Sequence, residues 1–391
     1  MIVYFVTGAT GAVGSAVVAQ LLTDPDAHVY ALVRAPSADA AAARLEQTMN
    51  ALGSRAPSVR DRERLRALAG DVEQPNFGVS DADRNALATN CTHIIHCAGA
   101  VRMNLPLATA RRAAVSSVHN ILVLARGLAA KGQLAKVDLV STVGVAGRET
   151  PLLREDWVGA DCAFHNTYEQ AKAEAEQPAR EAVGEGLPVT VHRPSMIVGD
   201  SKTGHALDFQ VFYFLVEFLS GRRTAGIFPE LGAARLDIVP VDFVAEAIVS
   251  SSNTDATAGR VLHLCAGTKE ALTLVRLQAV VREILEARGD PVPHARYLPR
   301  WLFRASARWL RLVTDAKTRA ALNTLPVFLD YLDTDQAFDN ARTTAWLQSE
   351  GIDIPRTADY LPRALEFYFA ATRRGRGDAR RSESSSGHAH G

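Results

Sequence analysis

Tyr168 and Lys172 are the residues whose types and spacing are best suited to chemistry. They stand four positions apart in the stretch Tyr-Glu-Gln-Ala-Lys, so a helix would place the phenol and the ammonium on one face. The residues that follow have helical composition, and Asn166 precedes them as an N-cap. A phenol with its usual pKa of ~10 is a poor acid or base at neutral pH, and a neighbouring ammonium would lower that pKa.

A hydroxyl group that could hold a substrate oxygen lies at the end of an upstream strand. Lys136–Val140 is typical of a buried strand and is followed by Ser141 and Thr142. A Tyr-x-x-x-Lys pair alone is common and is usually a surface pair. Here it follows both a Ser-Thr strand end and a glycine-rich turn, which favours a catalytic role.

That glycine-rich turn opens the chain. Ile2–Val6 is an apolar strand, and the residues after Thr7 lead into a helical stretch, Ala12–Leu22. A sharp strand-to-helix turn presents free backbone N–H groups and the positive end of a helix dipole, which suits a pyrophosphate. The spacing therefore predicts dinucleotide binding rather than an ordinary turn. The expected contacts in this turn are Gly8, Thr10, Gly11, Ala12, Val13 and Gly14.

Two arginines indicate which dinucleotide binds. The second strand, His28–Val33, ends at Arg34, where an acidic residue would favour the ribose hydroxyls of NAD. An arginine instead offers donors to the 2′-phosphate of NADP, and Arg44 on the next helix could add a second positive charge. We expect NADPH on this basis; the alternative is that both arginines are solvated surface residues.

Further cofactor contacts are expected at the ends of the next two strands. Arg64–Gly70 reads as the third strand, and Asp71, followed by Val72, could accept a hydrogen bond from the adenine amino group or cap the next turn. Thr92–Cys97 is the fourth strand. It is followed by small residues that let the backbone lie close to a cofactor, namely Ala98, Gly99 and Ala100.

Strands and helices alternate through the first 140 or so residues, with a long helical pattern over Leu105–Lys131. This alternation predicts an α/β fold: a Rossmann-type doubly wound parallel sheet with a smaller, mostly helical C-terminal substrate lobe. Further strands are expected at Pro188–His192 and Arg260–Leu264. The expected division is residues 1–200 for the NADP-binding domain, to which 236–267 return, 201–235 and 268–372 for the lobe, and 373–391 for a disordered tail.

Composition excludes several classes of protein. The 391 residues carry 43 basic and 43 acidic side chains, so no net charge favours nucleic acid. Four scattered cysteines suggest reduced thiols, and we expect no metal site. Met1 leads directly into a strand and no apolar run approaches the ~20 residues that span a bilayer, so we expect a cytoplasmic protein.

Two stretches of the second half bear on the substrate. Leu207–Leu219 is rich in aromatic and aliphatic residues and could line an acyl-chain channel or be an ordinary buried helix. The segment 299–313 mixes tryptophan and leucine with four arginines, so it could lie on a membrane surface or simply pack on the lobe.

With these residues in hand, the chain resembles an extended short-chain dehydrogenase/reductase over roughly 1–267. The resemblance implies that Tyr168 donates or accepts the proton and that Lys172 lowers its pKa and holds the nicotinamide ribose. Alignment of 145–147 with the family pattern gives Thr142 the oxygen-binding role. The residues that carry the resemblance are Thr7, Gly8, Gly11, Gly14, Asp71, Ala98, Gly99, Asn120, Ser141, Thr142, Tyr168 and Lys172.

One branch of that class fits best. The stretch 192–204 (HRPSMIVGDSKTG), with Leu32-Val33-Arg34, resembles the thioester reductases, which include fatty acyl-CoA reductases and the reductase domains of carboxylic acid reductases and peptide synthetases. Pro194 and Ser195, within this stretch, are counted among the cofactor contacts, as is Asn120. The resemblance implies that NADPH reduces an acyl thioester, carried by CoA or by a carrier protein, to an aldehyde or an alcohol.

Two other functions remain open at this point. The chain could be a dehydrogenase, reductase or epimerase that acts on a sterol, a β-keto lipid or a sugar nucleotide. It could also be a non-catalytic NADP sensor, although such proteins usually lose the tyrosine or the lysine, and this chain keeps both Tyr168 and Lys172.

Overall fold

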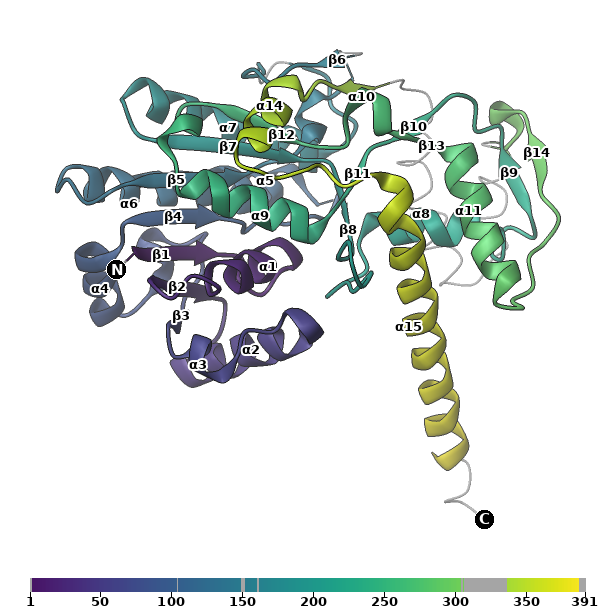
Figure 1. Ribbon diagram of the computed structural model, residues 1–391, viewed down its shortest axis with the longest axis horizontal. Coiled ribbons are helices and arrows are strands. Elements are labelled where there is room, and N and C mark those ends of the chain that lie inside the picture. The colour runs from purple at the N-terminus through teal and green to yellow at the C-terminus, as the bar shows by residue number, and fades with distance from the viewer. Residues whose placement is uncertain are drawn as a thin grey trace.

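A seven-stranded parallel sheet forms the centre of the computed structural model, in the order β12-β7-β5-β4-β1-β2-β3 (Figure 1). The structure describes residues 2–103, 105–148, 152–159, 162–303, 305 and 336–386, with side chains up to Arg373. The sheet strands are β1 (Ile2–Thr7), β2 (Ala27–Val33), β3 (Leu65–Ala69), β4 (His93–His96), β5 (Lys136–Val140), β7 (Val189–Pro194) and β12 (Val261–Leu264).

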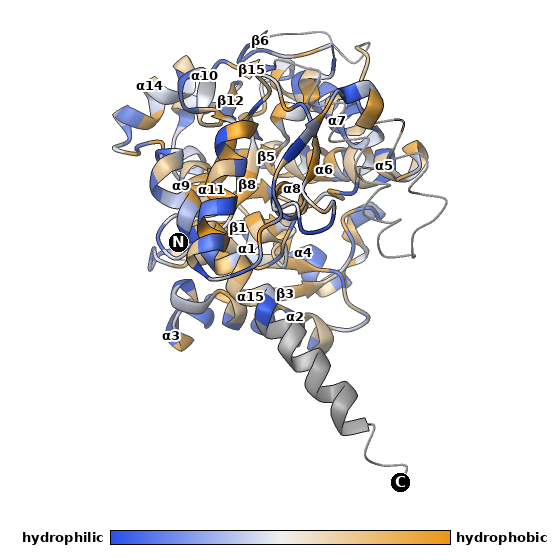
Figure 2. Cartoon of the chain, turned by 90° about the vertical axis from the view of Figure 1, so that its right-hand side faces the viewer, coloured by the Kyte–Doolittle hydropathy of each residue, from blue (hydrophilic) through white to orange (hydrophobic). Residues whose placement is uncertain are grey.

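Helices cover both faces of this sheet. One apolar core lies between the sheet, α1, α2, α9 and α14, and a second lies between the sheet, α4, α6 and α7. Figure 2 shows hydrophobic residues concentrated in the strands and hydrophilic residues in peripheral loops. The helices are α1 (Ala12–Leu21), α2 (Ala38–Ala51), α3 (Val59–Arg62), α4 (Asp81–Asn90), α5 (Leu107–Arg111), α6 (Ser117–Ala129), α7 (Thr167–Gly184), α8 (Val211–Leu219), α9 (Val241–Ser252), α10 (Gly267–Glu270), α11 (Leu274–Ala287), α14 (Ala341–Ser349) and α15 (Thr357–Ser386).

The doubly wound parallel sheet predicted from the sequence is confirmed. Its strand order reverses between β1 and β4, because the chain builds outward from β1 in one direction through β2 and β3 and then in the other direction from β4. Ligands of such sheets bind in the crevice at this reversal, beyond the carboxyl ends of the strands. The predicted helix at 105–131 is divided into α5 and α6 by a π-helical turn, Arg112–Ser116.

A separate lobe stands beside the carboxyl ends of the strands. Its apolar core joins α8, α11 and the first turns of α15. Within the segment expected to return to the main domain, Ile238–Pro240 pairs with 196–198 in a separate two-stranded parallel unit. The short strands are β6 (Leu152–Leu153), β8 (Met196–Val198), β9 (Ile227–Pro229), β10 (Arg235–Leu236), β11 (Ile238–Pro240), β13 (Leu272–Thr273), β14 (Arg296–Leu298) and β15 (Ala337–Phe338).

The C-terminal region differs from the expectation of a disordered tail from 373 onward. Helix α15 continues to Ser386 and projects from the body of the molecule (Figure 1). Its first turns pack into the lobe core through Leu361, Leu365 and Phe369. A helix that is already nucleated by packing gains one hydrogen bond for each residue added, which explains its extension over a polar sequence.

The segment 299–313 falls largely outside the described residues, so its proposed membrane contact stays a prediction. At its beginning, Trp301 is 72% exposed and Phe303 is buried in the lobe core. In the part of the chain that the structure describes, no helix combines the length and the apolar character needed to cross a membrane.

The close packing of α1 on β1 makes a prediction about Gly14. A Cβ atom at Gly14 would lie 2.2 Å from the Gly8 carbonyl oxygen, so Gly14→Ala must displace backbone. We expect it to lower the free energy of unfolding by about 1–3 kcal/mol. The matched control is Gly127→Ala on the exposed face of α6, where nothing lies within 4 Å of the added atom.

The control should raise the free energy of unfolding by about 0.5–1 kcal/mol, since alanine favours the helix. Both values are measured by chemical denaturation. Equal, small effects of the two substitutions would contradict the close packing of α1 on β1.

Candidate active site

One cavity of about 490 Å³ extends from the glycine turn to the C-terminal lobe. Its lining brings together the turn after β1, the ends of β4, β5 and β7, helix α7 and helix α8. The predicted site residues found in this lining are Gly8, Gly11, Ala12, Val13, Gly14, Gly99, Thr142, Tyr168, Lys172, Pro194 and Ser195. Those outside it are Thr10, Arg34, Arg44, Asp71, Val72, Ala98, Ala100 and Asn120.

The glycine turn has the shape that a dinucleotide pyrophosphate requires. Gly8 has a φ of +72°, and a Cβ atom there would lie 2.6 Å from the backbone nitrogen of Ala98. Gly11 is the N-cap of α1 and makes no side-chain cap, so the first N–H groups of the helix have no side-chain partner at the cap. These features lie at the crevice between β1 and β4, where the strand order reverses. The residues present therefore fit a nicotinamide dinucleotide.

Helix α7 positions the tyrosine and lysine pair. Asn166 caps the helix, since its side-chain oxygen accepts a hydrogen bond from the Glu169 N–H at 3.0 Å. The Lys172 ammonium donates to the Val140 carbonyl at the end of β5, at 2.9 Å, and lies beside Gly99. Burial, which opposes the charged form, lowers the pKa of Lys172 to about 8.

Tyr168 departs from one sequence-based expectation. Its pKa is raised to about 12, mainly because burial opposes the phenolate, while the Thr142 side chain acts in the opposite direction. The Lys172 ammonium is held by the Val140 carbonyl and does not lower the pKa of the phenol here. The expected lowering is therefore not found in this structure. The neutral phenol can still donate a hydrogen bond to a substrate oxygen at pH 7.

The hydroxyl groups of Ser141 and Thr142, which follow β5, have different hydrogen-bond partners. Ser141 lines the cavity, but its hydroxyl donates to the Glu176 carboxylate at 2.5 Å. The Thr142 hydroxyl oxygen accepts from the Gly144 N–H at 3.1 Å, and its side chain contacts the Tyr168 phenol. Thr142 is thus the hydroxyl that can meet a substrate oxygen beside Tyr168.

The adenine end of the crevice contains an arrangement that the sequence did not reveal. The Arg44 guanidinium donates to the Arg34 carbonyl at 2.7 Å, so both arginines lie beyond the end of β2. Arg34 also forms ion pairs with Asp71 at 3.0 Å and with Glu73 at 3.4 Å. Two carboxylates from beyond β3 therefore compete with a ligand phosphate for the Arg34 guanidinium.

Asp71 and Asn120 organise the turn that follows β3. One Asp71 oxygen accepts from the Glu73 N–H at 3.0 Å, which is the capping role that the sequence allowed. The Asn120 amide donates to the carbonyls of Val72 and Gln74, at 2.9 and 3.0 Å. Both side chains are thus engaged in supporting this turn, and neither lines the cavity.

Asp237 is a cavity residue that the sequence analysis missed. Its side chain is buried, and its two oxygens accept from the backbone N–H groups of Ala266 and Gly267, both at 2.8 Å. Burial raises its pKa to about 6, and Ser195 beside it acts in the opposite direction. Asp237 therefore holds the segment after β12, through two hydrogen bonds, against the part of the cavity wall that contains Ser195. The sequence offered one indication of this site, since Asp237 is an acidic residue within the otherwise apolar run 236–240.

The lobe supplies an apolar part of the cavity wall. The sequence left open whether 207–219 lines a channel or is an ordinary buried helix. Helix α8 belongs to the lobe core and also lines the cavity. Phe214 on the same helix is 60% exposed and faces away. The apolar lining residues of the lobe are Val211, Phe212, Leu215, Phe218, Leu219, Leu231, Leu236 and Leu274.

The fold and the site together define an oxidoreductase of the extended short-chain dehydrogenase/reductase class that binds a nicotinamide dinucleotide. Residues 6–248, more than half of the chain, match the family model described as Male sterility protein. The chain belongs to this family. The class named from the sequence motifs is thereby confirmed.

The chain is similar to parts of larger curated proteins. The isonitrile lipopeptide synthase of Streptomyces coeruleorubidus is 34% identical over 85% of this chain and 21% of its own length. The glycine betaine reductase of Emericella nidulans is 32% identical over 66% of this chain and 20% of its own length. The chain thus spans about a fifth of these curated relatives.

Solved structures are also similar to this chain. The terminal R domain from the myxalamid PKS-NRPS biosynthetic pathway superposes with a TM-score of 0.77 and 26% identity, covering 93% of this chain and 90% of that one. A thiolation-reductase di-domain from an archaeal non-ribosomal peptide synthetase has a TM-score of 0.75 at 19% identity, covering 95% of this chain and 76% of that one. The second likeness concerns the fold alone.

The lowered pKa of Lys172 predicts a pH dependence of NADPH binding. Lys172 is charged below pH 8 and neutral above it. Since the ammonium attracts an anionic cofactor, we expect the Kd for NADPH to rise several-fold as the pH passes through about 8. Fluorescence titration of NADPH measures this Kd. The Lys172→Met variant should bind NADPH weakly and show no change of Kd near pH 8. The Lys202→Met variant, altered at an exposed lysine, should keep the wild-type pH dependence. A midpoint near pH 8 that persists in Lys172→Met would contradict its assignment to Lys172.

The two arginines beyond β2 predict a preference for NADPH. Arg34→Ala should weaken NADPH binding by about tenfold and leave NADH binding nearly unchanged, because only NADPH carries the 2′-phosphate. Glu73→Gln serves as the companion variant: it removes a carboxylate that competes for Arg34 and should strengthen NADPH binding. Equal losses for both dinucleotides in Arg34→Ala would place the guanidinium outside the phosphate site.

Proposed function

We propose that this chain is an NADPH-dependent reductase that converts an acyl thioester to an aldehyde, with Tyr168 as the proton donor. The observation that carries the proposal is the single cavity described above. One end contains the dinucleotide turn with Thr142, Tyr168 and Lys172, and the other end is the apolar wall of the lobe. A nicotinamide and an apolar acyl group can therefore lie in contact within one enclosure.

The residues of the cavity suit each part of this reaction. The glycine turn binds the pyrophosphate, and Lys172 holds the nicotinamide ribose. When bound, the cofactor supplies a hydride to the thioester carbonyl carbon. Thr142 and the neutral phenol of Tyr168 donate hydrogen bonds to the carbonyl oxygen as it gains negative charge. Protonation at that oxygen and cleavage of the C–S bond then give the aldehyde and a free thiol, which balances one hydride and one proton against one thioester.

The apolar wall supports an acyl group with substantial hydrocarbon surface. A pocket of this kind favours apolar ligands and fixes them with a few polar groups at the reacting end. It disfavours a sugar nucleotide, which would leave its hydroxyl groups without partners against α8. The name of one relative, a lipopeptide synthase, is consistent with an apolar acyl group. A carrier-protein thioester is the favoured donor, because curated relatives of this chain include non-ribosomal peptide synthetases, and acyl-CoA is the alternative.

The direct test of this function measures NADPH oxidation with a panel of acyl thioesters of pantetheine and CoA. Products are identified by mass spectrometry. We expect aldehyde or alcohol from apolar acyl groups, and loss of turnover with retained NADPH binding in Tyr168→Phe. Retained turnover in that variant would remove Tyr168 from the mechanism. A wild-type protein that binds NADPH but reduces none of these thioesters, including carrier-bound ones, would refute the proposal.

The position of Leu215 predicts acyl-chain selectivity. Leu215 is 5% exposed and lines the cavity from α8, so Leu215→Phe should reduce its length. We expect kcat/KM for long acyl chains to fall by about tenfold and that for short chains to change little, because overpacking excludes only the longer ligand. Phe214→Ala, on the exposed face of the same helix, should alter neither. A uniform loss over all chain lengths would argue against an acyl channel along α8.

A further inference from the structure

A buried carboxylate that the mechanism above does not use lies directly behind the site. Glu176 is on α7, one helical turn beyond Lys172, and is 3% exposed. One of its oxygens accepts from the Ser141 hydroxyl at 2.5 Å and from the Arg193 Nε at 3.0 Å. The other accepts from the Arg193 Nη2 at 2.6 Å. One side chain on α7 therefore binds the ends of both β5 and β7.

Ser141 is itself part of the cavity lining, and both contacts of Glu176 are adjacent in sequence to another residue of the cavity. Ser141 immediately precedes Thr142, and Arg193 precedes Pro194. The Glu176 carboxylate thus lies where three elements that carry cavity residues meet. Small displacements of reacting groups cost large factors in rate, so such a junction affects the chemical step without contacting the substrate.

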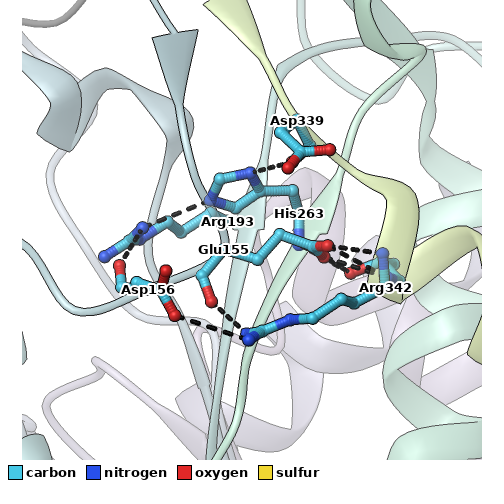
Figure 3. A network of polar contacts seen from close by, with 7 residues as sticks. Glu155, Asp156, Arg193, His263, Asp339 and Arg342 are labelled. Atoms are coloured by element: carbon cyan, nitrogen blue, oxygen red, sulfur yellow. Dashed lines mark hydrogen bonds and ion pairs between the residues drawn. The ribbon is translucent and has the colours of Figure 1, made fainter.

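Arg193 is itself held from its far side, as Figure 3 shows. Its Nη1 donates to the Asp156 carbonyl at 3.0 Å and to the His263 Nε2 at 3.2 Å. The His263 Nδ1 must donate to the Asp339 carbonyl, at 2.6 Å, because a carbonyl can only accept, and this leaves Nε2 free to accept. Burial and the guanidinium lower the pKa of His263 to about 3, so the imidazole stays neutral.

We propose that Glu176 is a positioning residue of this site: its carboxylate, fixed by Arg193, holds Ser141 and α7 so that Thr142, Tyr168 and Lys172 keep their relative places. The inference rests on the function proposed for the cavity. A fully buried ion pair adds little net stability compared with apolar residues of similar size. Its value here is geometric, since the guanidinium fork and the carboxylate fix both distance and direction.

The carboxylate also affects the charge of Lys172. The groups that face the ammonium are the Val140 carbonyl, Gly99, the Cys97 thiol, the His96 imidazole and Glu176. Burial raises the pKa of Cys97 to about 12 and lowers that of His96 to about 3, so both are neutral at pH 7. Glu176 supplies the negative charge that favours the ammonium.

The test compares Glu176→Gln with a matched control on the same helix. Glu174 forms a bidentate ion pair with Arg111 at the surface, both contacts at 2.7 Å, so Glu174→Gln removes an ion pair of the same kind away from the cavity. Turnover is expressed per NADPH-binding site, which excludes unfolded protein from the comparison. We expect Glu176→Gln to lower kcat by about tenfold or more with KM changed by less than about threefold. Glu174→Gln should leave both constants unchanged.

The pH midpoint of NADPH binding provides a readout that needs no turnover. In Glu176→Gln it should move to lower pH, because the ammonium loses a favourable charge, while Glu174→Gln should keep the wild-type midpoint. If the wild-type protein reduces no thioester, the proposed function fails, but this midpoint still tests the positioning role. An unchanged midpoint in a folded Glu176→Gln would overturn the role.

The Glu176→Gln variant leaves the Arg193 charge buried without its carboxylate partner, so it could fail to fold. In that case two further variants test the positioning role. Replacing the pair together, Glu176→Leu with Arg193→Met, should preserve folding and still lower kcat. Ser141→Ala removes a single hydrogen bond and should lower kcat by roughly tenfold with NADPH binding retained. Wild-type kcat per NADPH-binding site in both variants would show that the pair is only structural and would overturn the proposal.

Discussion

The reversal of strand order between β1 and β4 determines where every other part of the site can lie. At this point the chain leaves the sheet in opposite directions, which opens a crevice beyond the carboxyl ends of the two strands. The backbone must nevertheless pass very close to itself, because the position of a Cβ atom at Gly8 is already occupied by the main chain around Ala98. This close approach of the backbone therefore requires glycine at position 8. The glycine turn, Tyr168, Lys172 and the apolar wall of the lobe all line the cavity at this crevice.

Polar groups around this crevice are buried in a way that fixes their geometry. Lys172 is buried against the Val140 carbonyl, Asp237 is buried against two backbone N–H groups, and Glu176 is buried against Arg193. Burial removes the hydration of each of these side chains, and short, directional hydrogen bonds offset the free-energy cost. The ends of β5 and β7 and helix α7 are consequently held in one arrangement. The lobe, by contrast, meets the site through apolar side chains, which specify shape rather than particular partners.

The sequence predicted the parts of this structure that depend on local signals. The strands at 2–6, 28–33 and 136–140, the glycine spacing and the helix that carries Tyr168 all follow from periodicity and turn chemistry, and the structure agrees with them. The choice between Ser141 and Thr142 could not be made from the residues alone, because both hydroxyls stand at one strand end. It depends on Glu176, which is 35 residues away in the chain.

Other features could not be predicted from the sequence, because they too depend on contacts between residues that are far apart in the chain. The carboxylates that pair with Arg34 come from beyond β3, and the Cys97 and Val140 surroundings of Lys172 come from β4 and β5. The pKa of Tyr168 was expected to fall from its spacing to Lys172, but burial has the larger effect. The wall of the cavity is built from α8, the segment after β9 and β10, whose proximity is a property of the whole fold.

The central claim is that a nicotinamide and an apolar acyl thioester react within one cavity. The most direct measurement is a single turnover with NADPH deuterated at its transferable position and an apolar acyl thioester, followed by mass spectrometry of the product. The account predicts an aldehyde with one deuterium at its carbonyl carbon, formed by the wild-type protein and absent with Tyr168→Phe. Oxidation of the cofactor with no deuterium in the aldehyde would contradict direct transfer between the two ligands.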